Sequence, residues 1–186
     1  TLERFQRTRG VLRLMASVIH ELWMSNDASP MIMPGSIPLD VPNVREELIR
    51  YLDEGWNSIV SNAIDGKNSV PYQKDQSVPR YGQKLAARRV ARTIMLGSAP
   101  TVRAQSVRGI EASRIRLGVV QPGESIADFN DALNTLRGSL AYLYTNPTGD
   151  RYWFDTRPTL RKTAQERSTQ ISDIEVEYEI EPRLHK

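Results

Sequence analysis

Apolar residues recur at helical spacing in the segment from Gly123 to Arg161. Neighbouring members of the set stand three or four positions apart, which places their side chains on one side of a helix. The set comprises Ile126, Phe129, Leu133, Leu136, Leu140 and Leu143. Ser125 precedes it and is a suitable N-cap, because a serine hydroxyl accepts a hydrogen bond from a first-turn backbone N–H. We therefore expect an amphipathic helix that begins near Ile126.

Aromatic residues replace this pattern on both sides of a turn. Residues 142–144 read Tyr-Leu-Tyr, residues 146–150 read Asn-Pro-Thr-Gly-Asp, and residues 151–154 read Arg-Tyr-Trp-Phe. Aromatic residues favour strands and the intervening residue types favour turns, so the pattern predicts a β-hairpin. We expect Trp153 to be largely buried in it. Thr156 and Pro158 suit the start of a further, polar helix that reaches residue 171.

Two more helical segments precede this part of the chain. Residues 82–96 carry apolar positions at Leu85, Val90 and Ile94, and residues 107–119 carry Ile110 and Ile115. Three helices followed by a hairpin is the order of a winged-helix domain, which we predict over residues 82–157.

The N-terminal part of the chain also shows helical spacing. A stripe is formed by Phe5, Leu12, Met15, Ile19 and Leu22, with Trp23 beside it and Gly10 as a candidate junction between two helices. Prolines at positions 30, 34, 38 and 42 then predict an extended connector, because proline cannot donate to a helix ladder.

Three further segments complete this half. Asn43 is a candidate cap for a helix over residues 44–53, because Glu46 follows at the spacing of a capping box. Residues 56–64 predict a short helix that stops near Gly66. Residues 67–79 are polar and contain prolines, and we expect a loop there.

Composition narrows the class of protein. Of the 186 residues, 39% are hydrophobic and 25% are charged, which is ordinary for a globular domain. No apolar run approaches the ~20 residues that span a bilayer, so we expect no membrane partner. The absence of cysteine excludes disulfides and thiolate metal sites, and no secretory signal is visible. We therefore expect a cytoplasmic protein.

Charge is distributed unevenly, although the formal net charge is only +3. Residues 80–116 contain nine basic residues and one acidic residue, Glu111, whereas residues 173–186 contain five acidic residues. The alternation in that tail leaves strand and helix open. The asymmetry indicates an anionic partner for the middle of the chain. The alternatives are two solvated helix faces, or pairing between the two blocks.

Basic residues recur every four positions in the segment 82–96. Lys84, Arg88 and Arg92 share one side of the predicted helix, with Arg89 next to them. This spacing suits contacts with the phosphates of a nucleic acid. Further candidates for phosphate contacts are Arg114, Arg116 and Arg151. The alternative for the stripe is a solvated helix face.

Motifs for an autonomous active site are missing from the sequence. There is no glycine-rich phosphate loop and no dinucleotide fingerprint. His20 and His185 lie at opposite ends of the chain and form neither a metal cluster nor a base for a serine nucleophile. We therefore name no catalytic residue and no metal ligand.

Three blocks of the sequence resemble a known family. They are FQRTRGVLRLMASVIHELW, RTIMLGSAP, and the block from GVVQPGESIADFN to DRYWFDTRPTLRK. Together they resemble the region after the ATPase core in a family of large prokaryotic AAA-type ATPases, mostly of unknown function. Members of that family often occur beside DNA methylases and helicases in anti-phage gene clusters.

The resemblance implies roles for particular residues. Gly10 and Arg13 match the spacing of the lid motif in AAA-type ATPases, so Arg13 would be the sensor-two arginine that reaches the γ-phosphate, with Arg7 or Arg9 as rivals. The hairpin over residues 142–155 would be the wing. The Walker motifs have no counterpart in this chain. The resemblance therefore implies ATP and magnesium for the parent protein and no cofactor for this fragment.

These observations lead to one expected architecture and two functional hypotheses. The fold is expected to be mainly α with a small β-hairpin: a helical lid-like region over 1–66, a linker over 67–81, a winged-helix domain over 82–157 and a helical or acidic tail over 158–186. The first hypothesis is a non-catalytic accessory fragment of the ATPase that contacts the DNA backbone without sequence preference. The second is a protein–protein interaction module that docks on the ATPase core of the same parent chain, or on other subunits.

One structural observation separates the two hypotheses. Clustering of the basic stripe with Arg114 and Arg116 on one exposed surface would favour contact with DNA. An autonomous enzyme is the weakest reading of the sequence.

Overall fold

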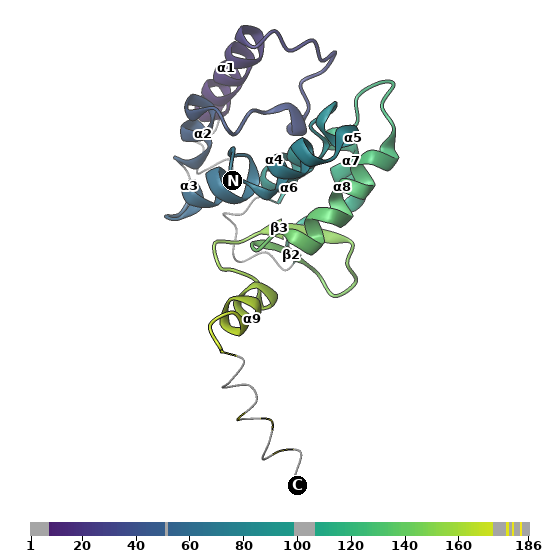
Figure 1. Cartoon of the computed structure of the whole chain (residues 1–186). Helices are drawn as coiled ribbons and strands as arrows, with labels where there is room; N and C mark the ends of the chain where they lie inside the picture. Colours follow the sequence, from purple (N-terminus) through teal and green to yellow (C-terminus); the bar gives the residue numbers. More distant parts are fainter. Residues whose placement is uncertain are drawn as a thin grey trace.

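Helix α6 (Ala86–Gly97) is the element around which most others pack (Figure 1). The computed structural model describes residues 8–50, 52–98 and 107–172, with isolated positions at 178, 180 and 183. Helices α4, α5, α7 and α8, strand β3 and the short helix η1 all contact α6. The buried apolar residues of α6 are Ala86, Ala87, Val90, Ala91, Ile94 and Met95. The middle of the chain therefore lies at the centre of the core.

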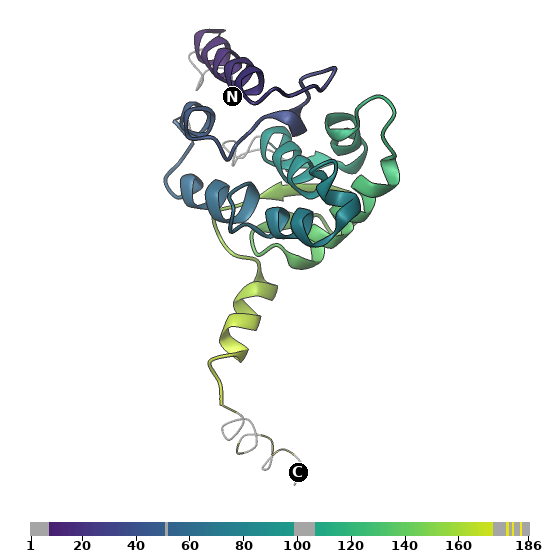
Figure 2. The same cartoon turned by 45° about the horizontal axis from the view of Figure 1, so that its top comes forward.

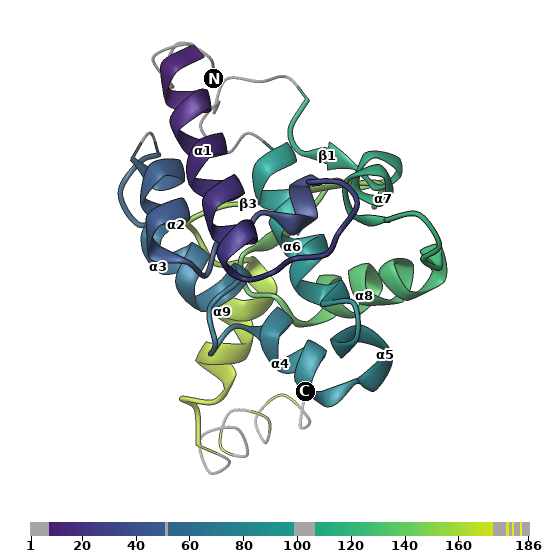
Figure 3. The same cartoon turned by 90° about the horizontal axis from the view of Figure 1, so that it is seen from above.

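The N-terminal elements form one end of the molecule (Figures 2 and 3). They are α1 (Thr8–Met24), η1 (Pro34–Ser36), α2 (Pro42–Ile49), α3 (Trp56–Ile59) and the π-helical turn η2 (Val60–Ile64). Among these elements, α1 packs mainly against α2. The connector between α1 and α2 brings η1 back onto α6, so the chain reaches the core again after leaving α1.

Gly35 makes the contact between η1 and α6 close. A Cβ atom at this position would lie 3.1 Å from the Cβ atom of Arg89 and 3.1 Å from the carbonyl oxygen of Gly118. Both distances are shorter than ordinary van der Waals contact. A side chain here would push η1 away from α6 and α7.

Two short helices replace the loop that was expected over residues 67–79. They are α4 (Val70–Ser77) and α5 (Pro79–Gly82). Ser69 caps α4 by accepting a hydrogen bond from the backbone N–H of Tyr72, and Pro71 lies in the first turn. The loop prediction is wrong because proline in a first turn costs no hydrogen bond, so it does not exclude a helix that begins there.

The C-terminal elements combine a three-stranded sheet with three helices. They are β1 (Ile110–Glu111), α7 (Ala112–Val119), α8 (Ile126–Ser139), β2 (Leu143–Thr145), β3 (Arg151–Phe154) and α9 (Leu160–Ser168). The strand order is β1-β3-β2 and both pairings are antiparallel. Ile110 pairs with Tyr152, and Leu143 pairs with Phe154. α9 extends away from the body of the molecule and has no buried residue (Figure 1).

Several expectations from the sequence are confirmed. The chain is mainly helical with a small antiparallel sheet in its described part. Ser125 caps α8 by accepting from the backbone N–H of Ala127, and the hairpin of β2 and β3 lies where it was expected. The short helix before Gly66 is also present, as α3 and η2.

Other expectations are wrong. Strand β1 occupies the start of the segment predicted as a helix over 107–119. α2 begins at Pro42 after Val41, so Asn43 is not its cap, and the Asn43 amide instead donates to Glu21 at 3.2 Å. α6 begins at Ala86 because Leu85 adopts a left-handed conformation, with φ of 51°, that a helix cannot contain.

Trp153 has intermediate burial, which is less than that of its neighbours Tyr152 and Phe154. Tyr152 and Phe154 point into the core, and Trp153 lies on the other side of β3, where its ring stacks on Tyr144 with 5.8 Å between ring centroids. The alternation of a strand explains the difference, since neighbouring side chains point to opposite sides of a sheet.

The core is one cluster of buried side chains from Leu14 in α1 to Phe154 in β3. The division at residues 66, 81 and 157 stays a prediction. The acidic tail lies largely outside the described residues, so its conformation stays open. No helix in the described ranges is long and apolar enough to cross a bilayer.

Candidate functional site

The basic residues of α6 do not form the exposed stripe that their spacing predicted. Arg89 is 8% exposed and Arg92 is 5% exposed, and the side chain of Arg88 is also largely covered. The expectation of an exposed stripe is wrong because α6 lies at the centre of the fold, where carboxylates from other elements reach its guanidinium groups. Contact between these residues and a nucleic acid stays a prediction.

Arg92 joins three segments through its guanidinium group. Its Nε donates to Oδ2 of Asp65 at 2.7 Å, and its Nη2 donates to Oδ1 of Asp40 at 3.2 Å. Its Nη1 reaches the carbonyl oxygen of Gly35 at 3.5 Å. Asp65 also accepts from the backbone N–H of Asp40 at 2.8 Å. The end of η2, the connector before α2, and α6 are therefore held together by one ion-paired network.

Arg88 joins the same network through longer contacts than those of Arg92. Its Nη1 lies 3.5 Å from Asp40 and 3.8 Å from Asp65, and its Nε lies 3.6 Å from Asp75. Its guanidinium group also lies over the ring of Tyr72, 5.2 Å from the centroid. Asp75 has a second role at the start of α6, where it accepts from the backbone N–H groups of Ala87 at 2.9 Å and of Arg88 at 3.2 Å.

Burial changes the acidity of both enclosed carboxyl groups. It raises the pKa of Asp65 to about 6, although the charge of Arg92 and its hydrogen bond act in the opposite direction. Burial also raises the pKa of Asp75, against the two backbone N–H donors of α6. Desolvation therefore outweighs the stabilisation of these two carboxylates by the arginines and the backbone N–H groups around them.

Arg89 and Lys84 link α6 to the region around α8. Arg89 forms a two-pronged ion pair with Glu124, at 2.7 and 3.0 Å, and donates to the carbonyl oxygen of Val119. Lys84 pairs with Asp128 at 2.7 Å, and Arg80 pairs with Asp131 at 2.9 Å. The carboxylates of α8 are therefore neutralised by cations of the segment around α5 and α6.

The three remaining predicted phosphate contacts do not join the stripe. Arg114 is exposed on α7, whereas Nε of Arg116 donates to the side chain of Asn130 at 2.9 Å. Arg151 pairs with Glu111 at 2.6 Å across β1 and β3 and donates to two backbone carbonyl groups. Six basic residues were expected on one exposed surface. Five of them instead contact side chains of other elements, namely Lys84, Arg88, Arg89, Arg92 and Arg116.

Arg13 lies on the side of α1 that faces α2. Its Nη2 pairs with Oε1 of Glu47 at 2.7 Å, and half of its side chain is exposed. Its rival Arg9 is exposed on the same helix, and Arg7 lies outside the described residues. The sensor-two role of Arg13 stays a prediction.

The surface of α1 and of the connector after it carries an exposed apolar cluster. Trp23 is 81% exposed and Leu12 is 66% exposed, and Ile19 on the turn between them is half exposed. Met31 and Ile32 of the connector are exposed to a similar degree, and both line one cavity with Ile19 and Trp23. We call these five residues the α1 patch. Exposed apolar clusters of this kind mark contact surfaces in proteins.

The sequence of α1 itself indicates a second apolar side, which the prediction of a single stripe did not distinguish from the core side. α1 buries Gly10, Leu14 and Val18, which lie on the side opposite Leu12 and Ile19. The helix therefore has apolar residues on two sides, and only one of them faces the core. A helix with apolar residues on two sides needs a second covering surface, and the α1 patch lies on the side that has none in the described structure.

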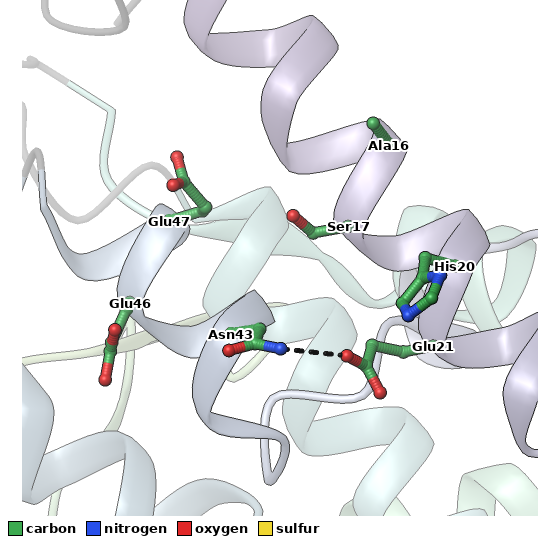
Figure 4. A pocket seen from close by; sticks show the side chains of 7 residues that line it. All are labelled: Ala16, Ser17, His20, Glu21, Asn43, Glu46 and Glu47. Atoms are coloured by element: carbon green, nitrogen blue, oxygen red, sulfur yellow. Dashed lines mark hydrogen bonds between the residues drawn. The ribbon is translucent and has the colours of Figure 1, made fainter.

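A polar cavity of about 370 Å³ lies between α1 and α2 (Figure 4). Its lining residues from α1 are Ala16, Ser17, His20 and Glu21, and those from α2 are Asn43, Glu46 and Glu47. A second cavity of about 450 Å³ opens between the end of α1 and α6, and Glu21, Asp27 and Asp40 line it together with Arg88 and Arg92. Within the described ranges, no group of three histidine, aspartate or glutamate residues is placed to bind a metal ion.

Comparison with known proteins gives one match. No curated protein and no solved structure matches the chain. A family model described as DUF499 second domain, for a family of unknown function, matches residues 1–154, which include every element from α1 to β3. This chain therefore belongs to the DUF499 second domain family.

Proposed function

We propose that this chain is an interaction module of a longer DUF499 protein, and that the α1 patch docks against another domain of the same polypeptide. The family description supports this proposal, because a second domain implies at least one neighbour. The observation that carries it is the α1 patch, whose five apolar residues are each between 46% and 81% exposed.

Burial of the α1 patch would provide a substantial driving force. Complete burial of one large apolar side chain stabilises a complex by about 1.5–3 kcal/mol. Trp23 and Leu12 have most of their surface available for such burial. Tryptophan is also among the residues that dominate binding energy at interfaces. The patch therefore has the composition of a docking surface and not of a solvated helix face.

The order of the C-terminal elements supports a winged helix as the scaffold behind this module. The order along the chain is α6, β1, α7, α8, β2 and β3, and β3 lies between the other two strands. A strand between the first two helices of a winged helix is a common part of that fold, so β1 strengthens the proposal although the sequence analysis missed it. Winged helices dock on proteins as well as on nucleic acids.

The resemblance to AAA-type ATPases suggests the neighbour. We expect the ATPase core of the parent protein, with its ATP and magnesium, to be the domain that covers the α1 patch. Arg13 lies on the same helix and would then lie beside that interface. Contact with the DNA backbone is the weaker proposal, because the cations of α6 are paired with carboxylates inside the fold.

Site-specific photocrosslinking in the complete DUF499 protein tests this proposal. A photoreactive phenylalanine analogue at position 23 should crosslink to another domain of the same polypeptide. The matched control is position 160 on α9, because Leu160 is also an exposed apolar residue, at 88%. Interdomain crosslinks from position 23 and none from position 160 support the proposal. No interdomain crosslink from position 23, or equal yields from both positions, would overturn it.

A further inference from the structure

The cavity of about 450 Å³ between the end of α1 and α6 has the size of a small-molecule site. Three segments enclose it, namely the end of α1, the connector between α1 and α2, and the start of α6 (Figure 3). One part of its lining, which we call the apolar wall, consists of Leu22, Met24, Pro38, Val41 and Leu85. The other part is polar and includes Glu21, Asp27, Asp40, Arg88 and Arg92. Apolar surface combined with a few charged groups is typical of pockets that bind small molecules.

Arg88 brings hydrogen-bond donors to this cavity that no described residue accepts. Its side chain is only 11% exposed, and its Nε is buried without a hydrogen-bond partner. Its contacts with Asp40, Asp65 and Asp75 are 3.5, 3.8 and 3.6 Å long, whereas hydrogen bonds within ion pairs are usually about 2.7–2.9 Å long. A guanidinium group carries five N–H donors, and a buried donor without an acceptor raises the free energy of the fold. Arg88 can therefore accommodate the anionic group of a ligand.

Glu21 and Asp27 bring negative charge to the same cavity. Glu21 accepts from the amide of Asn43 at 3.2 Å, and Asp27 accepts from the backbone N–H of Ser29 at 2.7 Å. Both of these donors are neutral, and no lysine or arginine among the described residues forms an ion pair with either carboxylate. The two carboxylates can therefore accommodate the cationic group of a ligand.

The backbone at Leu85 is a further sign of a ligand site. Leu85 lines the cavity and has a φ of 51°, in the left-handed region that a residue with a large side chain rarely adopts. Such backbone conformations cost free energy, and they are concentrated at active sites and ligand sites, where the surrounding structure holds them. Here the conformation sets the start of α6, and Arg88 follows three residues later at the wall of the cavity.

A ligand with one negative and one positive group satisfies both sets of residues. An anion alone would be repelled by Glu21 and Asp27, and a cation alone would leave Arg88 without an acceptor. We propose that this cavity binds a small zwitterion, namely an amino acid with a large apolar side chain. Its carboxylate accepts hydrogen bonds from Arg88, its ammonium group pairs with Glu21 and Asp27, and its side chain packs on the apolar wall. An amino acid is the smallest ligand that combines these three groups.

This site is distinct from the α1 patch, and the inference does not depend on the docking function proposed above. α1 packs mainly against α2, whereas the ligand lies between the end of α1 and the start of α6. Binding therefore adds a connection between α1 and the element at the centre of the fold.

NMR titration of the isotope-labelled chain with phenylalanine tests the inference. Two matched probes each lack one charged group: 3-phenylpropionate has no ammonium group, and 2-phenylethylamine has no carboxylate. We expect a Kd of about 0.1–1 mM for phenylalanine, as suits a ligand of this size, and about tenfold weaker binding of each matched probe. The amide signals that shift should belong to the segments that line the cavity, namely residues 21–27, 36–41 and 85–92.

Conservative substitutions assign the two ends of the ligand. Arg88→Lys keeps the positive charge but removes the forked donors, so it should weaken phenylalanine binding about tenfold and leave 2-phenylethylamine binding unchanged. Asp27→Asn at an exposed position should weaken phenylalanine binding without risk to folding and should not weaken 3-phenylpropionate binding. The matched controls are Arg114→Lys and Glu46→Gln, because both residues are exposed and neither lines this cavity.

Four results would overturn the inference. Binding of 3-phenylpropionate as tight as that of phenylalanine would show a site for anions only, and equally tight binding of 2-phenylethylamine would show a site for cations only. Shifts confined to other parts of the chain, or no shift at about 10 mM phenylalanine, would show that the cavity does not bind an amino acid of this kind. None of these results affects the docking function, which the crosslink from position 23 tests separately.

Discussion

Helices α6 and α1 place their side chains in opposite ways. α6 carries Arg89 and Arg92 but buries both, whereas α1 carries Trp23 and Leu12 and exposes both. The arginines of α6 are enclosed because Asp40, Asp65 and Glu124 come from other segments to meet them. Trp23 and Leu12 are exposed because, among the described elements, a helix packs only on the other side of α1. The environment supplied by distant segments, and not the residue type, decides which side chains are enclosed.

Among the substitutions considered, replacement of Arg92 should reduce the free energy of unfolding most. Arg92→Ala leaves Asp65 enclosed without its closest cation, and loss of one partner of a buried ion pair costs about 3–5 kcal/mol. Thermal unfolding should show a fall in Tm of roughly 10 °C. The matched control is Arg13→Ala, which removes an exposed ion pair and should cost at most about 1 kcal/mol. Equal losses for both variants would show that the network around Arg92 is not enclosed in solution.

The two sides of α1 provide the next test. Leu14→Ala removes a buried side chain and should cost about 2–5 kcal/mol in the free energy of unfolding. Leu12→Ala on the opposite side of the same helix should change that free energy by less than about 0.5 kcal/mol. Denaturant unfolding of the two variants measures the difference. If Leu12→Ala reduced the free energy of unfolding more than Leu14→Ala, the side of α1 that carries Leu12 would be the side that faces the core.

The enclosed carboxyl group of Asp65 predicts a pH dependence. Its pKa of about 6 is above the value in an unfolded chain, so the folded state favours the protonated form. The contribution of Asp65 to stability is therefore complete at low pH and is lost as the pH rises through about 6. Between about pH 5 and pH 7.5, the wild type should lose about 1 kcal/mol relative to Asp65→Asn. A difference that is constant with pH, or that has the opposite sign, would contradict the raised pKa.

The smallest effect is expected for a substitution in the α1 patch itself. Trp23→Ser removes a side chain that makes little contact with the rest of the chain, so the free energy of unfolding should change by less than about 0.5 kcal/mol. The same substitution should abolish the interdomain contact proposed for the complete protein. Unfolding of this chain and crosslinking from position 12 in the complete protein measure the two effects. If Trp23→Ser reduced the free energy of unfolding as much as Leu14→Ala, Trp23 would be shown to pack in the core.

Local patterns in the sequence predicted most of the helices and the hairpin. The serine cap before α8 and the turn between β2 and β3 depend on residues that are neighbours in the chain, so the sequence specifies them directly. β1 could not be found in the same way, since two residues carry no recognisable period and the strand exists only by pairing with β3. The start of α6 depends on one residue, Leu85, in a conformation that its type does not indicate.

The candidate site was predicted less well than the fold. Spacing identified which residues of α6 share a side, but it contained no information about the carboxylates that enclose them. Asp65 and Asp40 are distant from Arg92 in the sequence and meet it only after the connector folds back. Conversely, the stripe that contains Leu12 and Ile19 was found, and its exposure depends on the absence of a covering element within the described structure.

The position of β3 between β1 and β2 has a consequence for the order of folding. β2 and β3 are adjacent in the chain, and a short turn brings them together rapidly. β1 pairs with β3 only after the intervening chain, which contains α7 and α8, has closed a long loop. We therefore expect the backbone hydrogen bonds of β1 to become protected late in refolding, after those of the hairpin. Protection of the amides in β1 would then report that α7 and α8 have already docked.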